Sequence, residues 1–202
     1  MIPPNSRRFL THWRGLSATN AARAGKRPLK LGGVTIPFAR GLAGHSDADV
    51  LLHAVADALL GAVGAPDLGE QFPSSDRRYR NADSRTFVRA AFTQVQRLGW
   101  SVGNVDATVI ADAPRLTAHK ARMRRAIGQL LAVDESRVSV KAKTTEGFAP
   151  GPGGIAAQAV VLLEPAQGSG LPGPPVAIAG AGRARGQGRS SRSPQPRARS
   201  KR

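Results

Sequence analysis

The residues with the clearest chemical potential are concentrated in the stretch Gly44–Asp49 and in the apolar helix predicted to follow it. Together they provide two imidazoles, a hydroxyl and two carboxylates: His45, Ser46, Asp47, Asp49 and His53. Ser46 or Asp47 can cap the helix, because their side-chain oxygens accept backbone N–H groups of the first turn. A helix start also favours anions, since its free N–H groups carry the positive end of the helix dipole. The stretch therefore predicts a polar site for an anionic ligand.

His53 is flanked by carboxylates four residues away on either side, Asp49 and Asp57. That spacing places the three side chains on one helix face. A carboxylate beside a histidine can fix its tautomer and leave the other ring nitrogen for a metal. The alternative is a capped helix with a buried structural histidine satisfied by an aspartate.

Composition limits the classes of site that the chain can build. It has 202 residues, 41% of them hydrophobic, and no cysteine. Disulfides, thiolate nucleophiles and cysteine-based metal sites are excluded, which leaves His, Asp and Glu as metal ligands. No apolar run approaches the roughly 20 residues needed to cross a bilayer, so no membrane span is predicted.

The net charge of +17 comes mainly from the two ends of the chain. Residues 1–27 contain six basic residues and residues 165–202 contain eight, with no acidic residue in either segment. Residues 1–27 are predicted to be a transit segment, a disordered arm or a misassigned start. Residues 165–202 are predicted to be a disordered basic tail rich in Gly, Pro, Ser and Arg, able to contact nucleic acid only weakly. The expected compartment is the bacterial cytoplasm, or a plastid if residues 1–27 are a transit peptide.

Residues 28–164 form the predicted folded domain. Gly-Gly between two alternating runs predicts a hairpin over residues 29–36. Periodicity predicts three helices and three further strands, in the chain order helix 49–63, helix 83–98, strand 105–110, helix 117–131, strand 138–143 and strand 155–163. This order predicts an α+β fold with helices packed on one face of a mixed β-sheet. Because the other sheet face is left open, we expect the chain to oligomerise through it.

The motifs of the domain resemble those of one enzyme family. They include Leu31–Pro37, Gly44–Val50 with His53, Asp57–Gly61, Pro66–Gly69, Phe72–Asp76, Gly103–Thr108, Ala113–Arg115 and Lys141–Glu146. In order and spacing they resemble 2-C-methyl-D-erythritol 2,4-cyclodiphosphate synthase of the non-mevalonate isoprenoid pathway. The resemblance covers about residues 27–163.

The resemblance implies a small-molecule cytidine diphosphate substrate and an intramolecular phosphoryl transfer. The 2-phosphate of 4-diphosphocytidyl-2-C-methyl-D-erythritol 2-phosphate attacks the β-phosphate, closes the 2,4-cyclodiphosphate and expels CMP. The implied cofactors are Zn²⁺, or another divalent transition metal, and Mg²⁺ or Mn²⁺. The implied assembly is a homotrimer with active sites between subunits.

The resemblance also implies roles for individual residues. His53 is the implied zinc ligand and Glu146 the ligand of the second metal, while His45 and Thr144 stabilise the transition state. The positions implied to contact the substrate are Ser46, Asp67, Gly69, Phe72, Asp76, Ala111, Pro114, Arg115, Leu116 and Thr145. Ser46 is the implied contact beside His45, Asp67 and Gly69 belong to the erythritol-binding turn, and Phe72 and Asp76 to the loop that follows it. Ala111, Pro114, Arg115 and Leu116 belong to the loop that holds the cytosine.

Three departures from the family pattern leave alternatives open. No Asp-x-His zinc motif precedes residue 30, the loop Gly147–Gly154 is short and lacks an arginine, and Ser74 replaces a common aspartate. The first departure predicts either a misassigned N-terminus or a divergent, catalytically impaired member that binds cytidine nucleotide. If the N-terminus is as shown, we expect the protein to retain little zinc. A nucleic-acid-binding protein acting through its basic tails is the alternative from another class.

Overall fold

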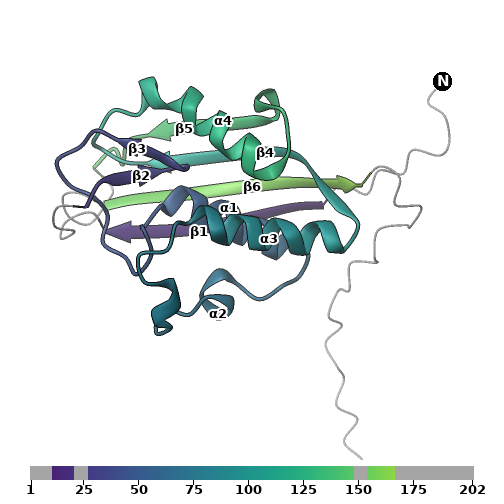
Figure 1. Cartoon of the computed structure of the whole chain (residues 1–202). Helices are drawn as coiled ribbons and strands as arrows, with labels where there is room; N and C mark the ends of the chain where they lie inside the picture. The colour runs from purple at the N-terminus through teal and green to yellow at the C-terminus, as the bar shows by residue number, and fades with distance from the viewer. Residues whose placement is uncertain (1–10, 21–26, 148–153, 167–202) are drawn as a thin grey trace, which may run out of the picture.

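A four-stranded mixed sheet forms the centre of the computed structural model, which describes residues 11–20, 27–147 and 154–166 (Figure 1). Its strands are β1 (Thr11–Asn20), β4 (Trp100–Ile110), β5 (Val138–Lys143) and β6 (Gly154–Pro165). They lie in the order β1-β6-β4-β5. The β4–β5 pair is parallel, whereas β6 is antiparallel to both β1 and β4. The predicted α+β fold with a mixed sheet is therefore confirmed.

The three longer helices pack beside one another on the sheet (Figure 1). The helix α1 (Val50–Ala62) contacts β1 and β6, and α3 (Arg85–Arg97) packs against α1. The helix α4 (Lys120–Leu131) covers β5. Because α1 lies between the sheet and α3, most of its side chains are buried, as its apolar sequence predicts.

The alternation of β6 shows which face of the sheet is covered. Every second residue from Ile155 to Leu163 is buried, whereas the residues between them are half-buried. A period of two is expected for a strand with one face on the core. The second face has no helix of the described chain over it, in agreement with the prediction.

The hairpin of β2 (Leu29–Leu31) and β3 (Val34–Ile36) forms a separate two-stranded sheet. Gly32 and Gly33 both have positive φ, 60° and 74°, which is the conformation of a tight hairpin turn. A Cβ atom on Gly32 would lie 3.1 Å from the side chains of Leu51 and Met123. The turn therefore sits directly on α1 and α4, and it holds the hairpin against the helix that carries His53.

The strand β1 corrects the sequence analysis, which assigned residues 1–27 to an N-terminal arm without an element. Residues 11–20 pair in continuous antiparallel register with β6, from Thr11 opposite Leu163 to Asn20 opposite Gly154. β1 is an edge strand, and its partner β6 lies at the other end of the domain sequence. Because residues 11–20 also show no regular alternation of apolar and polar residues, the hydrophobic pattern of the sequence could not identify the strand. Residues 1–10 and 21–26 of the arm and the tail from residue 167 lie outside the described residues.

Smaller differences concern element boundaries. The strand predicted over 105–110 begins at Trp100, because a bulge at Gly103 interrupts its register and hides its first half from pattern analysis. The helix predicted over 117–131 divides into a 3₁₀ turn, Thr117–His119, and α4. The polar connection between α1 and α3 contains α2 (Leu68–Gln71) and the 3₁₀ turn η1 (Arg77–Tyr79), and a further 3₁₀ turn, Glu135–Arg137, precedes β5. Within the described chain, no helix has the length and apolar character that a membrane crossing requires.

Candidate active site

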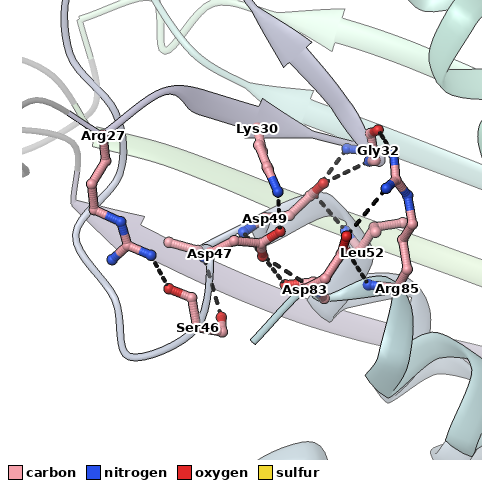
Figure 2. A network of polar contacts seen from close by, with 12 residues as sticks. Arg27, Lys30, Gly32, Ser46, Asp47, Asp49, Leu52, Asp83 and Arg85 are labelled. Atoms are coloured by element: carbon pink, nitrogen blue, oxygen red, sulfur yellow. Dashed lines mark hydrogen bonds and ion pairs between the residues drawn. The ribbon is translucent and has the colours of Figure 1, made fainter. Parts of the chain in front are cut away.

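The N-terminus of α1 is capped by Asp49, which is fully buried. Its carboxylate accepts hydrogen bonds from the backbone nitrogens of Leu52 at 3.0 Å, Gly32 at 2.8 Å and Gly33 at 2.6 Å (Figure 2). Burial raises the pKa of Asp49 to about 6, against the effect of these three donors. The prediction that Ser46 or Asp47 caps the helix is thus wrong, because the chain turns at Ala48, with φ of 59°, and the helix begins one residue after Asp49.

The ring of His53 contacts two hydroxyl groups. Its Nε2 lies 3.2 Å from Ser46 Oγ and 3.1 Å from Ser84 Oγ. Neither Asp49 nor Asp57 contacts the ring of His53. Asp49 accepts hydrogen bonds from the hairpin turn, and Asp57 accepts one from the Leu68 backbone at 2.9 Å. Burial lowers the pKa of His53, which favours the neutral form of the ring.

The carboxylate that reaches His53 does so through Ser84. Asp47 accepts hydrogen bonds from the hydroxyl of Ser84 and, at 3.2 Å, from its backbone nitrogen. The other oxygen of Asp47 forms an ion pair with Lys30 at 3.1 Å (Figure 2). Burial tends to raise the pKa of Asp47, but the hydrogen bonds from Ser84 and Lys30 together hold it below its usual value. We refer to Asp47, Asp49, His53 and Ser84 as the histidine cluster.

His45 lies on the loop before α1 and contacts the loop before η1. Its Nε2 is 3.0 Å from the carbonyl oxygen of Asp76. Because a carbonyl only accepts, Nε2 of His45 carries a proton and donates this hydrogen bond, which leaves Nδ1 without a role in the contact. The carboxylate of Asp76 is held by Arg78 Nε at 2.9 Å, and the hydrogen bonds from Arg78 lower the pKa of Asp76.

A cavity of about 460 Å³ brings together five of the residues predicted to act in the site. It is lined by His45, Ser46, His53, Gly69 and Phe72. Tyr79 and Phe87, which sequence analysis did not identify, also line it, and their rings pack against Phe72 at centroid distances of 5.3 and 5.0 Å. The cavity lining therefore combines aromatic rings with polar groups, which suits a small polar ligand with a carbon skeleton.

Two further predicted residues support the cavity from outside its lining. Asp67 caps α2 by accepting a hydrogen bond from Glu70 N at 2.9 Å, and α2 carries Gly69. Asp76, as described, fixes His45 through its carbonyl oxygen. Both residues thus position lining groups within the single chain.

The remaining predicted residues gather at the ends of β4 and β5. Because these strands are parallel neighbours, their carboxyl ends meet at one edge of the sheet. The predicted residues at this edge are Ala111, Pro114, Arg115, Leu116, Thr144, Thr145 and Glu146. None of them is among the residues lining the cavity.

Asp112, which sequence analysis missed, ties the two strand ends together. It accepts hydrogen bonds from Thr145 N at 2.8 Å and from Thr145 Oγ at 2.9 Å, and these bonds lower its pKa. Thr144 Oγ donates to the carboxylate of Glu146, whose φ of 51° is unusual for a residue with a side chain. Such backbone outliers occur preferentially at functional sites. We refer to Asp112 and Thr144–Glu146 as the Thr-Thr-Glu corner.

The two candidate metal sites differ in how well their residues fit an ion. Among the described residues, no three His, Asp or Glu side chains lie close enough to hold a metal. A catalytic zinc normally has three protein ligands, so His53 by itself does not fit zinc. Mg²⁺ is usually held by one or two carboxylates together with substrate phosphates, and the exposed Glu146 fits that pattern.

The sequence gives no distinctive evidence that Ser84 contacts His53, because a serine at this position has a more common role. Ser84 stands immediately before α3, where a serine is expected to cap a helix. The Asp112 signal was weaker still, because an aspartate in a loop between a strand and a proline is typical of a turn. Both contacts depend on segments more than thirty residues away.

Comparison with known proteins gives one consistent result. Residues 15–164 match the model of the YgbB family. The 2-C-methyl-D-erythritol 2,4-cyclodiphosphate synthase of Shouchella clausii is 52% identical over 143 residues, covering 70% of this chain and 90% of that protein. The enzyme of the same name from Thiobacillus denitrificans is 56% identical over 140 residues, covering 68% and 88%.

Solved structures agree with the sequence relatives. The bifunctional IspDF of Campylobacter jejuni superposes with a TM-score of 0.73 at 37% identity, covering 78% of this chain and 43% of that one. The IspF of Plasmodium falciparum, solved as a CDP complex, superposes with a TM-score of 0.64 at 31% identity, covering 78% and 97%.

Proposed function

The chain belongs to the YgbB family, and from this membership we propose that the cavity at the N-terminus of α1 carries the erythritol side of a cyclodiphosphate synthase site. The protein is a 2-C-methyl-D-erythritol 2,4-cyclodiphosphate synthase. It converts 4-diphosphocytidyl-2-C-methyl-D-erythritol 2-phosphate into the 2,4-cyclodiphosphate and releases CMP. The observation that carries the site assignment is the meeting of His45, Ser46, His53, Gly69 and Phe72 in one cavity.

The reaction defines what the residues must do. An oxygen of the 2-phosphate bonds to the β-phosphorus, and the bond from that phosphorus to the oxygen of the α-phosphate breaks, so CMP departs with the electron pair. Two anionic groups must approach in line, and catalysis therefore depends on positioning and on compensating negative charge. His45 suits this task, because its contact with the Asp76 carbonyl fixes the ring at the cavity wall.

The Thr-Thr-Glu corner is proposed to act on the diphosphate and the nucleotide. The hydroxyl of Thr144 is proposed to stabilise the transition state, and Thr145 and the loop Ala111–Leu116 are proposed to contact the cytidine moiety. Glu146 is proposed to hold Mg²⁺ or Mn²⁺, which when bound would offset charge on the phosphates. The zinc expected from the sequence stays a proposal with His53 as its candidate ligand, and no step is assigned to it because the described residues do not complete its site.

The position of the corner supports a homotrimer with sites between subunits. In Figure 1 β5 forms one edge of the sheet and α2 lies beyond the other edge, past β1, and the cavity lining includes no residue of the corner. The uncovered sheet face carries half-buried apolar residues, among them Ile110, Val160 and Leu162. We propose that this face is the subunit interface and that a second copy supplies the missing half of each site. Sedimentation at several protein concentrations tests this, and a stable monomer would contradict it.

The activity is tested by release of CMP from the cytidylylated substrate in the presence of Mg²⁺ and Zn²⁺. The full-length chain is expected to turn over, and His45→Ala is expected to lose at least about 100-fold in kcat, the usual effect of removing a positioned transition-state donor. His119→Ala, a histidine of the 3₁₀ turn before α4, is the matched control and should retain activity. CMP binding without turnover by the wild-type chain would instead identify an impaired member of the family.

A further inference from the structure

Ser84 occupies the N-cap position of α3 but does not cap the helix. Serine is among the preferred N-cap residues because its oxygen accepts backbone N–H groups of the first turn. Here no side-chain capping bond is formed, and the residue is fully buried. Its hydroxyl is directed instead toward Asp47 and His53. The position therefore uses the side chain for something other than the stability of α3.

The proton of the Ser84 hydroxyl can be assigned from its two partners. Asp47, whose pKa is held low, is an acceptor only, so Ser84 must donate to it. A hydroxyl has one proton, and Ser84 therefore faces His53 Nε2 with a lone pair at 3.1 Å. A contact of that length is favourable only if Nε2 carries a proton.

The second hydroxyl near His53 is consistent with the same assignment. Ser46 Oγ lies 3.2 Å from Nε2 and accepts a hydrogen bond from Ala48 N, also at 3.2 Å. The oxygen of Ser46 has a second lone pair, which can accept a hydrogen bond from a protonated Nε2 as well. If Nε2 were unprotonated, Ser46 could donate to it, but Ser84 would then oppose two lone pairs in a buried site.

Asp47 is itself fixed by contacts from two other elements. Lys30 on the hairpin pairs with one carboxylate oxygen, while the backbone nitrogen of Ser84 donates to the other. The side chain of Asp47 is 11% exposed and that of Lys30 is 29% exposed, so solvent weakens the ion pair only in part. A chain of contacts thus runs from the hairpin through Asp47 and Ser84 to the ring of His53.

We propose that Ser84, held by Asp47, is the positioning residue that keeps His53 in the Nε2–H tautomer and leaves the lone pair of Nδ1 available to the ligand of the cavity. The proposal rests on the function proposed above only in assuming that His53 acts in the site. The serine–aspartate pair thereby does what a directly bonded carboxylate does beside many functional histidines. It also explains why Asp47, which is half-buried and forms no hydrogen bond with His53, is held in place beside Ser84.

The tautomer of His53 in the metal-free, substrate-free protein tests the proposal directly. Long-range ¹H–¹⁵N NMR spectra of protein with labelled histidine, recorded at about pH 8, where histidine is neutral, distinguish the two tautomers. His53→Gln identifies the signals of His53. The wild-type protein is expected to give the Nε2–H pattern, and Ser84→Ala is expected to gain a substantial Nδ1–H population.

Two further variants separate positioning from packing. Ser84→Thr keeps the hydroxyl and should keep the Nε2–H pattern, whereas Asp47→Asn lets Ser84 donate to Nε2 and should shift His53 toward Nδ1–H. Ser136→Ala, an exposed serine between α4 and β5, is the control and should leave the spectrum unchanged. An Nε2–H pattern that persists in Ser84→Ala overturns the proposal, and one that persists in Asp47→Asn overturns the role of Asp47.

The kinetic consequence is measured separately, so that the two proposals can fail independently. Ser84→Ala is expected to lower kcat for CMP release about 10-fold, the usual effect of removing an outer partner of a functional histidine, and Ser84→Thr should restore it. If Ser84→Ala shifts the tautomer of His53 but the wild-type protein releases no CMP, the positioning role is supported and the proposed function is contradicted. Unchanged kcat in Ser84→Ala with a shifted tautomer would overturn the link to catalysis.

Discussion

The histidine cluster and the Thr-Thr-Glu corner are built on different principles. In the cluster, Asp49 and Ser84 are fully buried; Asp49 accepts hydrogen bonds from the hairpin and from α1, and Ser84 donates to Asp47. In the corner, Asp112 and Glu146 are exposed and are held by hydrogen bonds from neighbouring threonines. The cluster is therefore an integral part of the folded chain, whereas the corner stands at a sheet edge with its acceptors accessible to a ligand.

This difference suggests a division of tasks within one site. Buried polar networks are rigid because each unpaired group would cost free energy, so the cluster can hold a ring in one orientation before substrate arrives. Exposed carboxylates and hydroxyls can exchange their contacts for a phosphate or a metal ion at low cost. Substitutions in the cluster should consequently affect folding as well as turnover, whereas those in the corner should affect turnover with little effect on folding.

The largest expected effect is the loss of folding stability in Asp49→Ala. The change removes the cap of α1 and leaves the nitrogens of Gly32 and Gly33 without their acceptor in a buried site. We expect the free energy of unfolding to fall by about 4 kcal/mol, from one cap and two buried unpaired donors. Urea denaturation measures this. Asp134→Ala removes an exposed cap of a 3₁₀ turn and is expected to lower the free energy of unfolding much less. Equal costs would show that burial does not distinguish the two sites.

The next effect is on turnover, in the corner. Thr144→Ala removes the hydroxyl that now contacts Glu146 and is expected to lower kcat about 100-fold with the unfolding midpoint unchanged. CMP release and thermal denaturation on the same preparation measure both quantities. Thr93→Ala, an exposed threonine of α3, is the control. A large loss of stability in Thr144→Ala would contradict the proposed contrast.

Lowering the pH should act on the two regions in opposite directions. The pKa of Asp49 rises from 3.8 in the unfolded chain to about 6 on folding, so between these values the folded state binds more protons. Its contribution to stability is then largest below about pH 4 and is lost as the pH rises through about 6, a change on the order of 2 kcal/mol. Asp49→Asn should remove this dependence, and urea denaturation from pH 4 to 7 measures the difference between the two proteins. An identical pH profile would contradict it.

In the corner the sign is reversed, because the bonds from Thr145 lower the pKa of Asp112. The stabilising effect of these bonds is present above the unfolded pKa and is lost as the pH falls through the folded one. Hydrogen exchange of the Thr145 amide, which donates to Asp112, should therefore accelerate in acid relative to its intrinsic rate. Protection that persists when Asp112 is protonated would show that another contact holds the corner.

The smallest expected effect belongs to Asp112→Ala. The carboxylate joins the loop after β4 to the corner but is exposed, so we expect about a 10-fold loss of affinity for CMP and little change in stability. Isothermal titration calorimetry with CMP measures the affinity. Asp134→Ala again serves as the exposed-aspartate control, and unchanged affinity in Asp112→Ala would show that the loop and the corner are positioned independently.

The sequence by itself determined the elements whose signals are local. The Gly32–Gly33 hairpin, the amphipathic helices and β5 follow from turn chemistry and periodicity, and the family motifs identified His45, His53 and Glu146. These features depend on residues within a few positions of one another, so pattern is sufficient to predict them.

The tertiary structure decided which polar groups meet. Asp49 was expected beside His53, but the hairpin turn offers it two backbone donors, and a buried carboxylate takes the strongest set of donors available. His53 instead contacts Ser84, which lies 31 residues after it in the chain and donates a hydrogen bond to Asp47. The strand β1 likewise becomes visible only when β6 pairs with it. Each of these contacts joins distant segments, and their relative positions are fixed by packing of the core and not by local sequence.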